Sequence, residues 1–343
     1  MPEAHDVKTY IESTGALHEA LGLTSPLPVE VRMLARGEYN QNFVFSHPET
    51  GQELLFRVNL GSQMHLENQI EYEAHALELL APSGRTPRLL YVDGSKSFFG
   101  KGILVEEFLS GRPLDYSTDL TLAAQILADI HSVPVAQGHG LVMPRNPLVS
   151  MLEECFAMFS QYRRWSNADT GVVCQIESWF KKAEKWAEQW EQNQKLLGLS
   201  APGRHIISTE LNSGNFLINE GACSYLIDWE KPLFAEVEQD LAHFLVPTTT
   251  YWKTDTILDD AAIDDFIDEY CYAVAGRFET AEVRNHLTGY LATTCLRGIT
   301  WCAMAFVQHI SNEREVADAY TFEKIRLYLS SEFLTLLKDR YYR

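Results

Sequence analysis

The pattern of hydrophobic residues changes near residue 110, and this change constrains the fold more than any other feature of the chain. From about residue 29 to residue 108, short segments rich in Val, Leu and Phe alternate with turn residues, which is typical of β-strands. We expect strands in VEVRMLA, NFVFSH, ELLFRVNL, RLLYVDG and GILVEEFL. The segment LENQIEYEAHALELLA repeats its hydrophobic residues at helical spacing and predicts one helix among these strands.

The chain after Gly111 has the pattern of amphipathic helices. The segments LTLAAQILADIHSV, SMLEECFAMFSQYRR and SWFKKAEKWAEQWEQN, with most of the chain after Asp259, place hydrophobic residues on one helical face. A length of 343 residues is sufficient for two domains. The sequence therefore predicts an α+β fold, with a small β-rich domain at residues 1–108 and a larger helical domain at residues 109–343.

The charge and composition of the chain exclude several classes of binding partner and cellular location. The formal net charge is −19, and so acidic a surface repels nucleic acids and anionic membranes. No hydrophobic run approaches the ~20 residues that a membrane-spanning helix needs, and MPEAHDVKTYIESTG has no pattern of a secretory signal. We therefore expect a cytoplasmic protein that binds neither nucleic acid nor membrane. The six cysteines lack the spacing of metal ligands, and we interpret them as free thiols.

Residues 208–231 form the one strongly β-like segment of the helical half, and polar residues flank its hydrophobic runs. If Gly221 and Ala222 are the central residues of a tight turn, the strands pair so that Asn215 lies opposite Asp228. An amide oxygen and a carboxylate at that position suit Mg²⁺, whose remaining coordination positions are filled by phosphate and water. Asn and Asp are also common in turns, and a longer turn would change the pairing, so a purely structural role stays open.

Glu210 precedes Asn215 by five residues, and this spacing adds a catalytic interpretation. Protein kinases place their catalytic carboxylate, their Asn and their metal-binding Asp in the same order, with the same separation between the first two. Phosphoryl transfer to a hydroxyl needs this combination, because the carboxylate orients or deprotonates the acceptor while the metal neutralises charge on the phosphates.

Several segments together resemble the aminoglycoside phosphotransferase and choline kinase-like family. LNSGNFLI and YLIDWE resemble the catalytic motif of that family, and EQDLAHFL resembles the element whose Asp, here Asp240, braces the catalytic loop. ADIHSVP, VEEFLSGRPL and LARGEYNQNFVF resemble three further family elements, and the similarity spans most of residues 30–250. The resemblance implies a protein kinase-like bilobal fold, with a β-rich nucleotide-binding N-lobe and a mainly helical C-lobe that carries the catalytic loop and the metal-binding hairpin.

The resemblance also implies roles for individual residues. Glu210 would be the catalytic base, and Asn215 and Asp228 would bind the metal. Arg57 would replace a phosphate-binding Lys, with Glu73 as its ion-pair partner, although an ordinary surface pair would also explain these two residues. The other residues implied to bind the nucleotide are Gly37, Asn40, Glu107 and Leu109.

Three residues depart from the family pattern. Glu210 stands in place of Asp, Ser208 in place of His, and Arg57 in place of Lys. Glu carries its carboxylate one methylene further out, and a displacement of ~1 Å at a reacting group can cost on the order of 100-fold in rate. Arg presents a planar guanidinium where Lys presents a compact ammonium, and the two are not interchangeable at phosphate sites.

We therefore predict a phosphotransferase that uses ATP or GTP, with Mg²⁺, to phosphorylate a hydroxyl of a small molecule such as an aminoglycoside, an amino alcohol or a sugar. The alternative is a catalytically impaired pseudokinase that binds a nucleotide or a metabolite. Protein kinase activity is a third possibility, but the chain contains neither a G-x-G-x-x-G loop nor an A-P-E motif.

Two further features bear on the acceptor. Seven acidic residues between Asp255 and Glu269 could attract a cationic acceptor, or could form a solvated helix face. Three aromatic residues could line the acceptor site or could belong to the core or its rim, namely Trp229, Tyr251 and Trp252.

Overall fold

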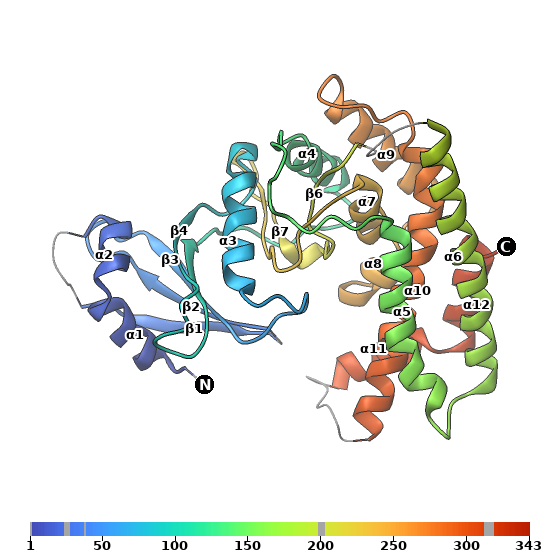
Figure 1. Cartoon of the computed structure of the whole chain (residues 1–343), viewed down its shortest axis with the longest axis horizontal. Helices are drawn as coiled ribbons and strands as arrows, with labels where there is room; N and C mark the ends of the chain where they lie inside the picture. Colours follow the sequence, from blue (N-terminus) through green and yellow to red (C-terminus); the bar gives the residue numbers. More distant parts are fainter. Residues whose placement is uncertain (1, 24–27, 38, 198–202, 312–318) are drawn as a thin grey trace. The chain divides into compact units, whose positions relative to one another are not determined.

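The computed structural model describes residues 2–23, 28–37, 39–197, 203–311 and 319–343 (Figure 1). The contacts within the chain divide it into two compact units. The first unit consists of Met1–Leu114, Val133–Leu141 and Asn215–Pro232. The second unit consists of Asp115–Ser132, Val142–Gly214 and Leu233–Arg343. The first unit therefore contains two segments that come after residue 114 and are separated from it in the chain by parts of the second unit.

The first unit is built on a five-stranded sheet with the order β1-β2-β3-β5-β4. All neighbouring strands in this sheet are antiparallel. The strands are β1 (Val31–Arg36), β2 (Asn40–Ser46), β3 (Glu53–Asn59), β4 (Leu89–Asp93) and β5 (Ile103–Glu107). Each of the five segments that the sequence predicted to be a strand is one.

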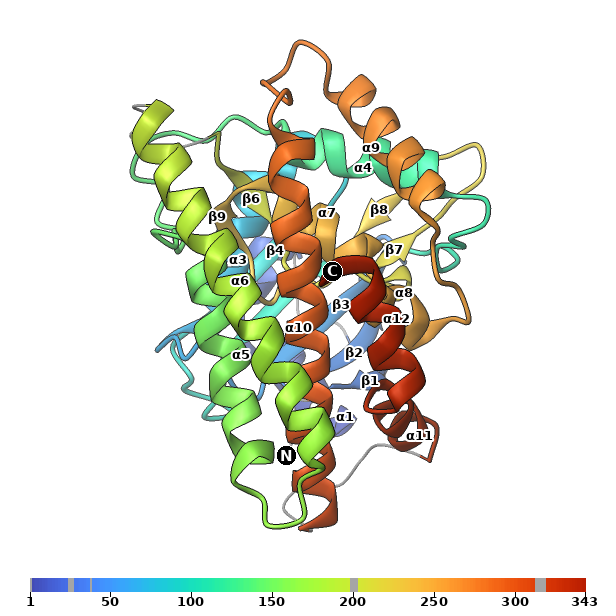
Figure 2. The same cartoon turned by 90° about the vertical axis from the view of Figure 1, so that its right-hand side faces the viewer.

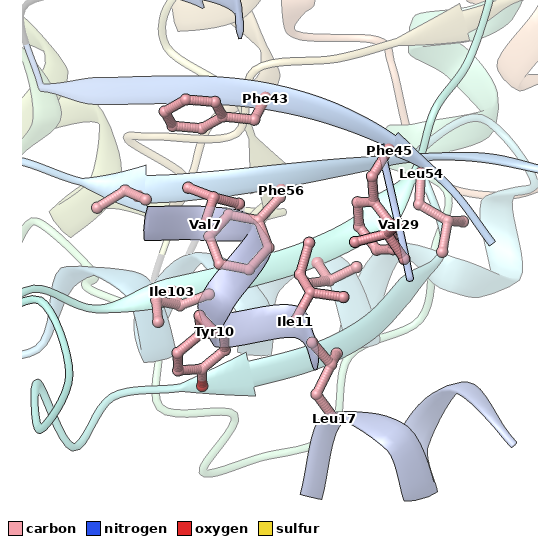
Figure 3. Packing of buried hydrophobic residues seen from close by; sticks show 12 residues of the cluster. Val7, Tyr10, Ile11, Leu17, Val29, Phe43, Phe45, Leu54, Phe56 and Ile103 are labelled. Carbon is pink, nitrogen blue, oxygen red and sulfur yellow. The ribbon is translucent and has the colours of Figure 1, made fainter. Parts of the chain in front are cut away.

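Two helices that the sequence analysis did not predict, α1 (Ala4–Ser13) and α2 (Gly15–Leu21), pack against one face of this sheet. Figure 3 shows side chains of both helices among the aromatic and aliphatic side chains of the strands. The core residues that the helices contribute are Val7, Tyr10, Ile11 and Leu17. The first unit therefore contains more helix than the single inserted segment that was expected.

Strands β3 and β5 alternate between the two faces of the sheet, and this alternation positions charged residues. The β3 residues in the core beneath α1 are Leu54, Phe56 and Val58. Arg57 therefore points to the opposite face, where α3 (Gln69–Leu80) lies (Figure 1). Arg57 pairs with Leu104 of β5, so Glu106, two residues further along β5, shares its face.

The second unit is mainly helical. Figure 2 shows α10 (Val283–Ile310) beside α5 (Pro147–Arg164) and α6 (Thr170–Leu197), and it also contacts α7 (Val237–Leu245). The other helices of this unit are α4 (Leu120–His131), α8 (Pro247–Lys253), α9 (Asp260–Val274), α11 (Ala319–Tyr328) and α12 (Ser331–Tyr341). A small antiparallel sheet and a larger helical part confirm the predicted α+β fold.

Helix α10 runs through the packed interior of the second unit. In the part of the chain that the structure describes, it is the one helix long and apolar enough to cross a membrane, judged by length and composition alone. Of its most apolar window, 72% is buried inside the protein, as expected of a helix in a protein core. A Cβ atom at Gly298 would lie 2.6 Å from Cβ of Thr248, so glycine allows α8 to approach α10 closely.

Two short strands flank the segment between residues 208 and 231, and two more lie within it. In the second unit β6 (His205–Ile207) pairs with β9 (Leu233–Ala235), and in the first unit β7 (Phe216–Leu217) pairs with β8 (Tyr225–Leu226). In chain order, Glu210 follows β6 and Asp228 follows β8. All six cysteines lie in the described ranges, and none forms a disulfide.

Candidate functional site

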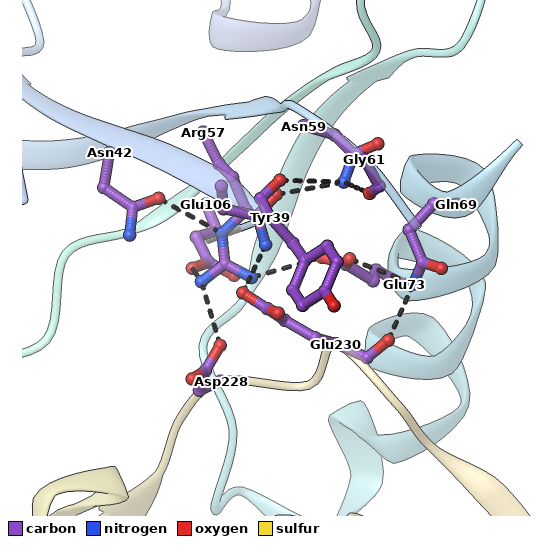
Figure 4. Close-up of polar contacts among 11 residues, drawn as sticks. Tyr39, Asn42, Arg57, Asn59, Gly61, Gln69, Glu73, Glu106, Asp228 and Glu230 are labelled. Carbon is purple, nitrogen blue, oxygen red and sulfur yellow. Dashed lines mark hydrogen bonds and ion pairs between the residues drawn. The ribbon is translucent and has the colours of Figure 1, made fainter. Parts of the chain in front are cut away.

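Arg57 lies at the centre of a buried cluster of charged side chains in the first unit (Figure 4). Its Nη1 is 3.1 Å from Oε2 of Glu73, so the ion pair expected between these two residues is present. Its Nη2 is 3.9 Å from Oε1 of Glu106 and 3.8 Å from Oδ1 of Asp228. The side chains of Arg57 and Glu73 are 8% and 1% exposed, which excludes an ordinary surface pair.

Arg57 interacts with four carboxylates in the same unit, so the cluster carries excess negative charge when all four are ionised. Burial raises the pKa of Glu73 to about 7, against the opposing charge of Arg57. Burial and the charge of Asp228 raise the pKa of Glu230 to about 8. Burial raises the pKa of Glu106 as well. A bound cation would neutralise this excess negative charge.

The turn before β2 is tied to this cluster through Glu230, which the sequence analysis did not single out. Asn40 donates a hydrogen bond from Nδ2 to the Glu230 carboxylate, and its Oδ1 accepts one from Asn59 at 3.1 Å. The turn itself is closed by the N–H of Gly37, which donates to the carbonyl of Asn40 at 2.9 Å. Asn40 is 2% exposed, so its side chain fixes the backbone of the turn. Between Gly37 and Asn40, Glu38 lies outside the described residues.

The end of β5 was expected to bind a nucleotide base through backbone groups near Glu107 and Leu109. The N–H of Glu107 donates to the carbonyl of Arg88 at 3.0 Å, and that of Phe108 donates to the carbonyl of Glu53 at 3.4 Å. These two donors are therefore used within the first unit. The prediction of base binding rests on Leu109 and on the carbonyl groups of this segment.

The predicted register of the hairpin between Asn215 and Asp228 is wrong by one residue. Phe216 pairs with Leu226, whereas a two-residue turn would pair Phe216 with Ile227. The N–H of Ile227 donates to the carbonyl of Asn215 at 2.9 Å. Asp228 consequently lies one residue beyond the partner of Asn215 and is not directly opposite it.

The turn of this hairpin is longer than two residues, which explains the shifted register. The N–H of Asn219 donates to Oγ of Ser224 at 2.9 Å, and its side-chain amide donates to the carbonyl of Cys223 at 3.0 Å. Gly221, near the middle of the turn, has a left-handed φ of 74°. Side-chain hydrogen bonds of Asn and Ser therefore close a turn that the Gly-Ala pair alone did not reveal.

Asp228 leaves β8 with an unusual backbone, since its φ of 70° lies in the left-handed region. Few residues other than glycine adopt this conformation, although Asp is enriched among them. Its side chain, which contacts Arg57, is 39% exposed, so one part of the carboxylate is bound and another part faces solvent. An exposed carboxylate of this kind is accessible to a metal ion.

The oxygen ligands available at Asn215 and Asp228 fit Mg²⁺ better than a metal that needs a complete protein site. Within the described ranges no group of three or more His, Cys, Asp or Glu residues could hold a metal ion. Mg²⁺ is usually bound by one or two carboxylates together with the phosphates of the substrate and water. The prediction of a magnesium site formed jointly with a nucleotide is therefore compatible with these side chains.

In the second unit, Asp240 of α7 fixes the loop that carries Glu210. One carboxylate oxygen of Asp240 accepts a hydrogen bond from the N–H of Ser208 at 2.7 Å, and the other accepts one from Thr209 at 2.6 Å. Asp240 is fully buried, and its Oδ2 lies 3.3 Å from Nε2 of His131. The bracing contact expected of Asp240 is therefore present.

Thr209, directly before Glu210, has a left-handed φ of 66°. This conformation is an outlier for a β-branched residue, and strain of this kind clusters at functional sites, where the surrounding structure maintains it. Here the hydrogen bonds from the backbone to Asp240 maintain the strained conformation of Thr209. Ser208, which stands where the family has His, takes part through its backbone, while its Oγ is buried with no hydrogen-bond partner in the part of the chain that is described.

Glu210 forms an ion pair that the sequence analysis did not predict. Its Oε1 lies 3.4 Å from Nη2 of Arg297 on α10. The same guanidinium forms two hydrogen bonds of 3.1 Å with the carboxylate of Glu154 on α5. The side chain of Glu210 is 31% exposed and that of Arg297 is 19% exposed. The carboxylate of Glu210 is therefore charge-paired on one side and open to solvent on another.

The acidic segment around α9 forms ion pairs within the second unit. Arg284 pairs with two of its carboxylates, Asp264 and Asp268. Lys324 and Arg340 pair with two others, Asp255 and Asp260. These contacts favour a paired and solvated helix face over a surface reserved for a cationic acceptor.

The aromatic residues considered for the acceptor site take part in packing. The ammonium of Lys324 lies 3.8 Å from the ring centroid of Tyr251. Trp252 packs edge-on against Trp301, with ring centroids 5.4 Å apart. Trp229 is 2% exposed. Trp229 is therefore a core residue, whereas Tyr251 and Trp252 are half-buried and pack at the rim of the core.

A protein-family model described as the phosphotransferase enzyme family matches residues 30–284, well over half of the chain. The chain belongs to this family. The match agrees with the resemblance to aminoglycoside phosphotransferases and choline kinase-like enzymes. The phosphotransferase family consists of small-molecule kinases that transfer phosphate to hydroxyl groups. A search of curated protein sequences gave no match.

Solved structures similar to this phosphotransferase share its fold at low sequence identity. A putative aminoglycoside phosphotransferase from Ralstonia eutropha JMP134 is 15% identical over 98% of both chains, with a TM-score of 0.65. An ethanolamine kinase from Plasmodium vivax is 14% identical over 98% of this chain and 97% of that one, with a TM-score of 0.61. A spectinomycin phosphotransferase in complex with ADP and spectinomycin is 14% identical over 91% and 92%, with a TM-score of 0.54. These likenesses confirm the protein kinase-like fold.

In each unit of the phosphotransferase, two charged residues that interact with predicted site residues or their partners were not singled out from the sequence. The alternation of β5 contained a signal for Glu106, which follows the partner of Arg57 by two residues. Glu230 stands two residues after Asp228 in the IDWE segment. Nothing in the local sequence indicated Glu154 or Arg297, because their contact depends on how α5 packs against α10.

Proposed function

We propose that this protein transfers the γ-phosphate of ATP or GTP, with Mg²⁺, to a hydroxyl group of a small molecule. The observation that carries the proposal is Glu210, which is partly exposed on a loop that Asp240 holds in a strained conformation. In the chain, this carboxylate precedes Asn215 by five residues. A family of small-molecule kinases uses a carboxylate and an Asn in this order.

The first unit would bind the nucleotide and the metal. Asn215 and Asp228 would provide oxygen ligands for Mg²⁺, and the bound metal would neutralise charge on the phosphates during transfer. Arg57 would contact a phosphate through its guanidinium, whose orientation Glu73 and Glu106 restrict. A cation and a polyphosphate bound together would also balance the excess negative charge around Arg57.

Glu210 would orient the acceptor hydroxyl and accept its proton. A general base must be ionised and must reach the acceptor, and the carboxylate of Glu210 meets the first requirement through Arg297 and the second through its exposed part. The acceptor would be an aminoglycoside, an amino alcohol or a sugar-like molecule, as expected from the family.

The test is ADP or GDP release from the Mg²⁺ nucleotide in the presence of a panel of hydroxyl compounds. The panel contains spectinomycin, other aminoglycosides, choline, ethanolamine and monosaccharides, and mass spectrometry checks each positive compound for added phosphate. We expect one class to give turnover that EDTA abolishes. Glu210→Gln and Asp228→Asn should each lower kcat by on the order of 100-fold or more.

A matched control is Asp265→Asn, which removes an exposed carboxylate from α9 and should leave turnover unchanged. Nucleotide binding without turnover of any acceptor, in a folded sample, would favour the pseudokinase alternative. Absence of both binding and turnover would contradict the proposal.

A further inference from the structure

Arg297 of α10 bridges two carboxylates in the second unit, and one of them belongs to the proposed base. Its Nε and Nη2 each bind the carboxylate of Glu154 at 3.1 Å, and Nη2 also lies 3.4 Å from Oε1 of Glu210. We propose that Arg297, held by Glu154, is a positioning residue that fixes the carboxylate of Glu210. This inference rests on the proposed function, in which Glu210 is the base.

The need for a positioning residue follows from the side chain of Glu210. Glu has one more rotatable bond than the Asp that the family places at this position, so its carboxylate can occupy more positions relative to the backbone. The strained backbone at Thr209 fixes where the side chain of Glu210 begins. The backbone alone does not fix the position of the carboxylate group at the end of the side chain. The contact with Arg297 supplies this second constraint.

Arg297 is suited to this task because it is itself held firmly. Two parallel hydrogen bonds between a guanidinium and a carboxylate fix both the direction and the plane of the guanidinium. The side chain of Arg297 is 19% exposed, and the next residue, Gly298, is the point where α10 lies close against Thr248. The backbone and the guanidinium of Arg297 are thus both restricted, so the group that contacts Glu210 has little freedom to move.

Two other titratable groups near this bridge, His243 and Cys155, have pKa values shifted toward their neutral forms. Burial lowers the pKa of His243, and the charge of Arg297 lowers it further. Its Nδ1 lies 2.8 Å from the carbonyl of Leu211. Burial raises the pKa of the Cys155 thiol to about 12. The charged side chains that contact one another in this bridge are those of Glu154, Arg297 and Glu210.

Glu154 has a second effect, because it shares the guanidinium with Glu210. Nη2 of Arg297 lies 3.1 Å from the carboxylate of Glu154 and 3.4 Å from that of Glu210, so its contact with Glu154 is the shorter one. A neutral residue at position 154 would leave the full charge of Arg297 to Glu210, which would stabilise the carboxylate and weaken it as a base. Loss of Arg297 would do the opposite, because Glu210 would lose its nearby positive charge. The two substitutions should therefore shift the pH dependence in opposite directions.

The experiment compares Arg297→Gln, Arg297→Lys and Glu154→Gln with a matched control, Arg284→Gln. Arg284 also lies on α10 and also bridges two carboxylates, those of Asp264 and Asp268. Initial rates of ADP release are measured from pH 5 to pH 9, with MgATP and the acceptor found in the panel, and with water as the acceptor. Urea unfolding gives the stability of each variant.

We expect Arg297→Gln to lower kcat by on the order of 10- to 100-fold while the KM for MgATP stays within about 2-fold. The acid limb of its kcat profile should move to higher pH, and that of Glu154→Gln should move to lower pH. Arg297→Lys should recover part of the lost kcat, because it restores the charge without the planar fork. Arg284→Gln should have the kcat and the pH profile of the wild type.

Several outcomes would overturn the inference without touching the proposed function. One such outcome is an Arg297→Gln variant whose kcat and pH profile equal those of Arg284→Gln. Another is that Arg297→Gln and Glu154→Gln lose stability and kcat while the acid limbs of their kcat profiles stay at the wild-type pH. Arg297→Gln should also cause no further loss in a Glu210→Gln background, and an additive loss would contradict a role through Glu210. If Arg297→Gln does not fold, Arg297→Lys and Glu154→Gln decide the question. A wild type without turnover would refute the proposed function itself.

Discussion

Arg57 and Glu73 form a buried ion pair, with Nη1 and Oε2 separated by 3.1 Å and side chains that are 8% and 1% exposed. The pair joins the centre of the sheet to α3. It belongs to a cluster in which carboxylates outnumber the guanidinium, so each charge depends on its partners more than in an isolated pair. The contribution of Arg57 to stability can therefore be tested directly.

Replacement of Arg57 by Met should destabilise the protein strongly, because it leaves Glu73 and Glu106 buried without a counter-charge. We expect the free energy of unfolding at pH 8 to fall by about 3–5 kcal/mol, measured by urea unfolding. The control is Arg32→Met in β1, since Arg32 pairs with Glu53 at 3.0 Å on the surface of the same unit. That change should cost less than about 1 kcal/mol. Equal losses in the two variants would show that the Arg57 cluster is not a buried electrostatic unit.

Stability should fall as pH rises through the titration of Glu236, which is buried at the start of α7. Its Oε2 accepts a hydrogen bond from Tyr290 at 3.1 Å, and its Oε1 lies 3.6 Å from Nε of Arg204. Burial raises the pKa of Glu236 from 4.5 to about 7. The folded protein thus binds this proton more tightly than the unfolded chain, so the contribution of Glu236 to stability is fully present below pH 4.5 and is lost as pH rises through 7.

Glu236→Gln should flatten this part of the stability profile. The pH-dependent contribution of Glu236 amounts to about 3 kcal/mol, because its pKa rises from 4.5 to about 7 on folding. Urea unfolding of the wild type and the variant at pH 5, 6, 7 and 8 measures it. An exposed carboxylate on α9, changed by Glu269→Gln, serves as the control and should leave the slope unchanged. A variant Glu236→Gln with the wild-type slope would refute the assignment.

Asp240→Asn should impair catalysis more than nucleotide binding. An Asn side chain has one carbonyl oxygen, so it can accept the N–H of Ser208 or that of Thr209 but cannot replace both contacts. We expect a loss of about 1–3 kcal/mol in stability and a fall in kcat on the order of 100-fold. The thermal shift caused by MgATP should remain.

The matched control for Asp240→Asn is Ser208→Ala, which keeps the braced backbone and removes an Oγ that has no hydrogen-bond partner among the described residues. Removal of such a group is expected to be nearly neutral. Comparable losses of turnover in the two variants would mean that the backbone hydrogen bonds of Asp240 do not position the loop.

Nucleotide binding should depend on Mg²⁺ through Asp228. A ligand at 100 times its Kd adds about 2.7 kcal/mol to the stability of the folded state, which a thermal-shift assay with MgATP detects easily. We expect the shift to shrink when EDTA is present and also in Asp228→Asn. A full shift for Asp228→Asn, equal to that of the wild type with the same dependence on Mg²⁺, would exclude Asp228 as a metal ligand.

The sequence predicted those features that arise from local periodicity. Short hydrophobic segments between turn residues located all five strands of the main sheet, and helical spacing located α3, whereas the pairing of Glu73 with Arg57 was implied by the family resemblance. The hairpin register was wrong because the hydrogen bonds of Asn219 and Ser224 lengthen its turn. These bonds depend on side-chain geometry, which the hydrophobic pattern does not contain.

Hydrophobic patterns in the sequence do not predict contacts between residues that lie far apart in the chain. Arg297 and Glu210 are 87 residues apart in the chain, and their ion pair requires a particular rotation of α10 about its own axis. Helices α1 and α2 were missed for a different reason. They are 10 and 7 residues long, and segments this short give a weak periodic signal.

The first unit is discontinuous in the chain, and this has a consequence for biosynthesis. Asn215–Pro232 belongs to it together with Met1–Leu114, so Asp228 and Glu230 leave the ribosome more than 100 residues after the strands they accompany. During that interval Arg57 can pair with Glu73 and Glu106, but not with Asp228 or Glu230. At a synthesis rate of about 5–20 residues per second the delay lasts several seconds or more. Completion of this unit is therefore coupled to translation of most of the protein, and a fragment that ends at residue 114 would lack two of the acidic residues around Arg57.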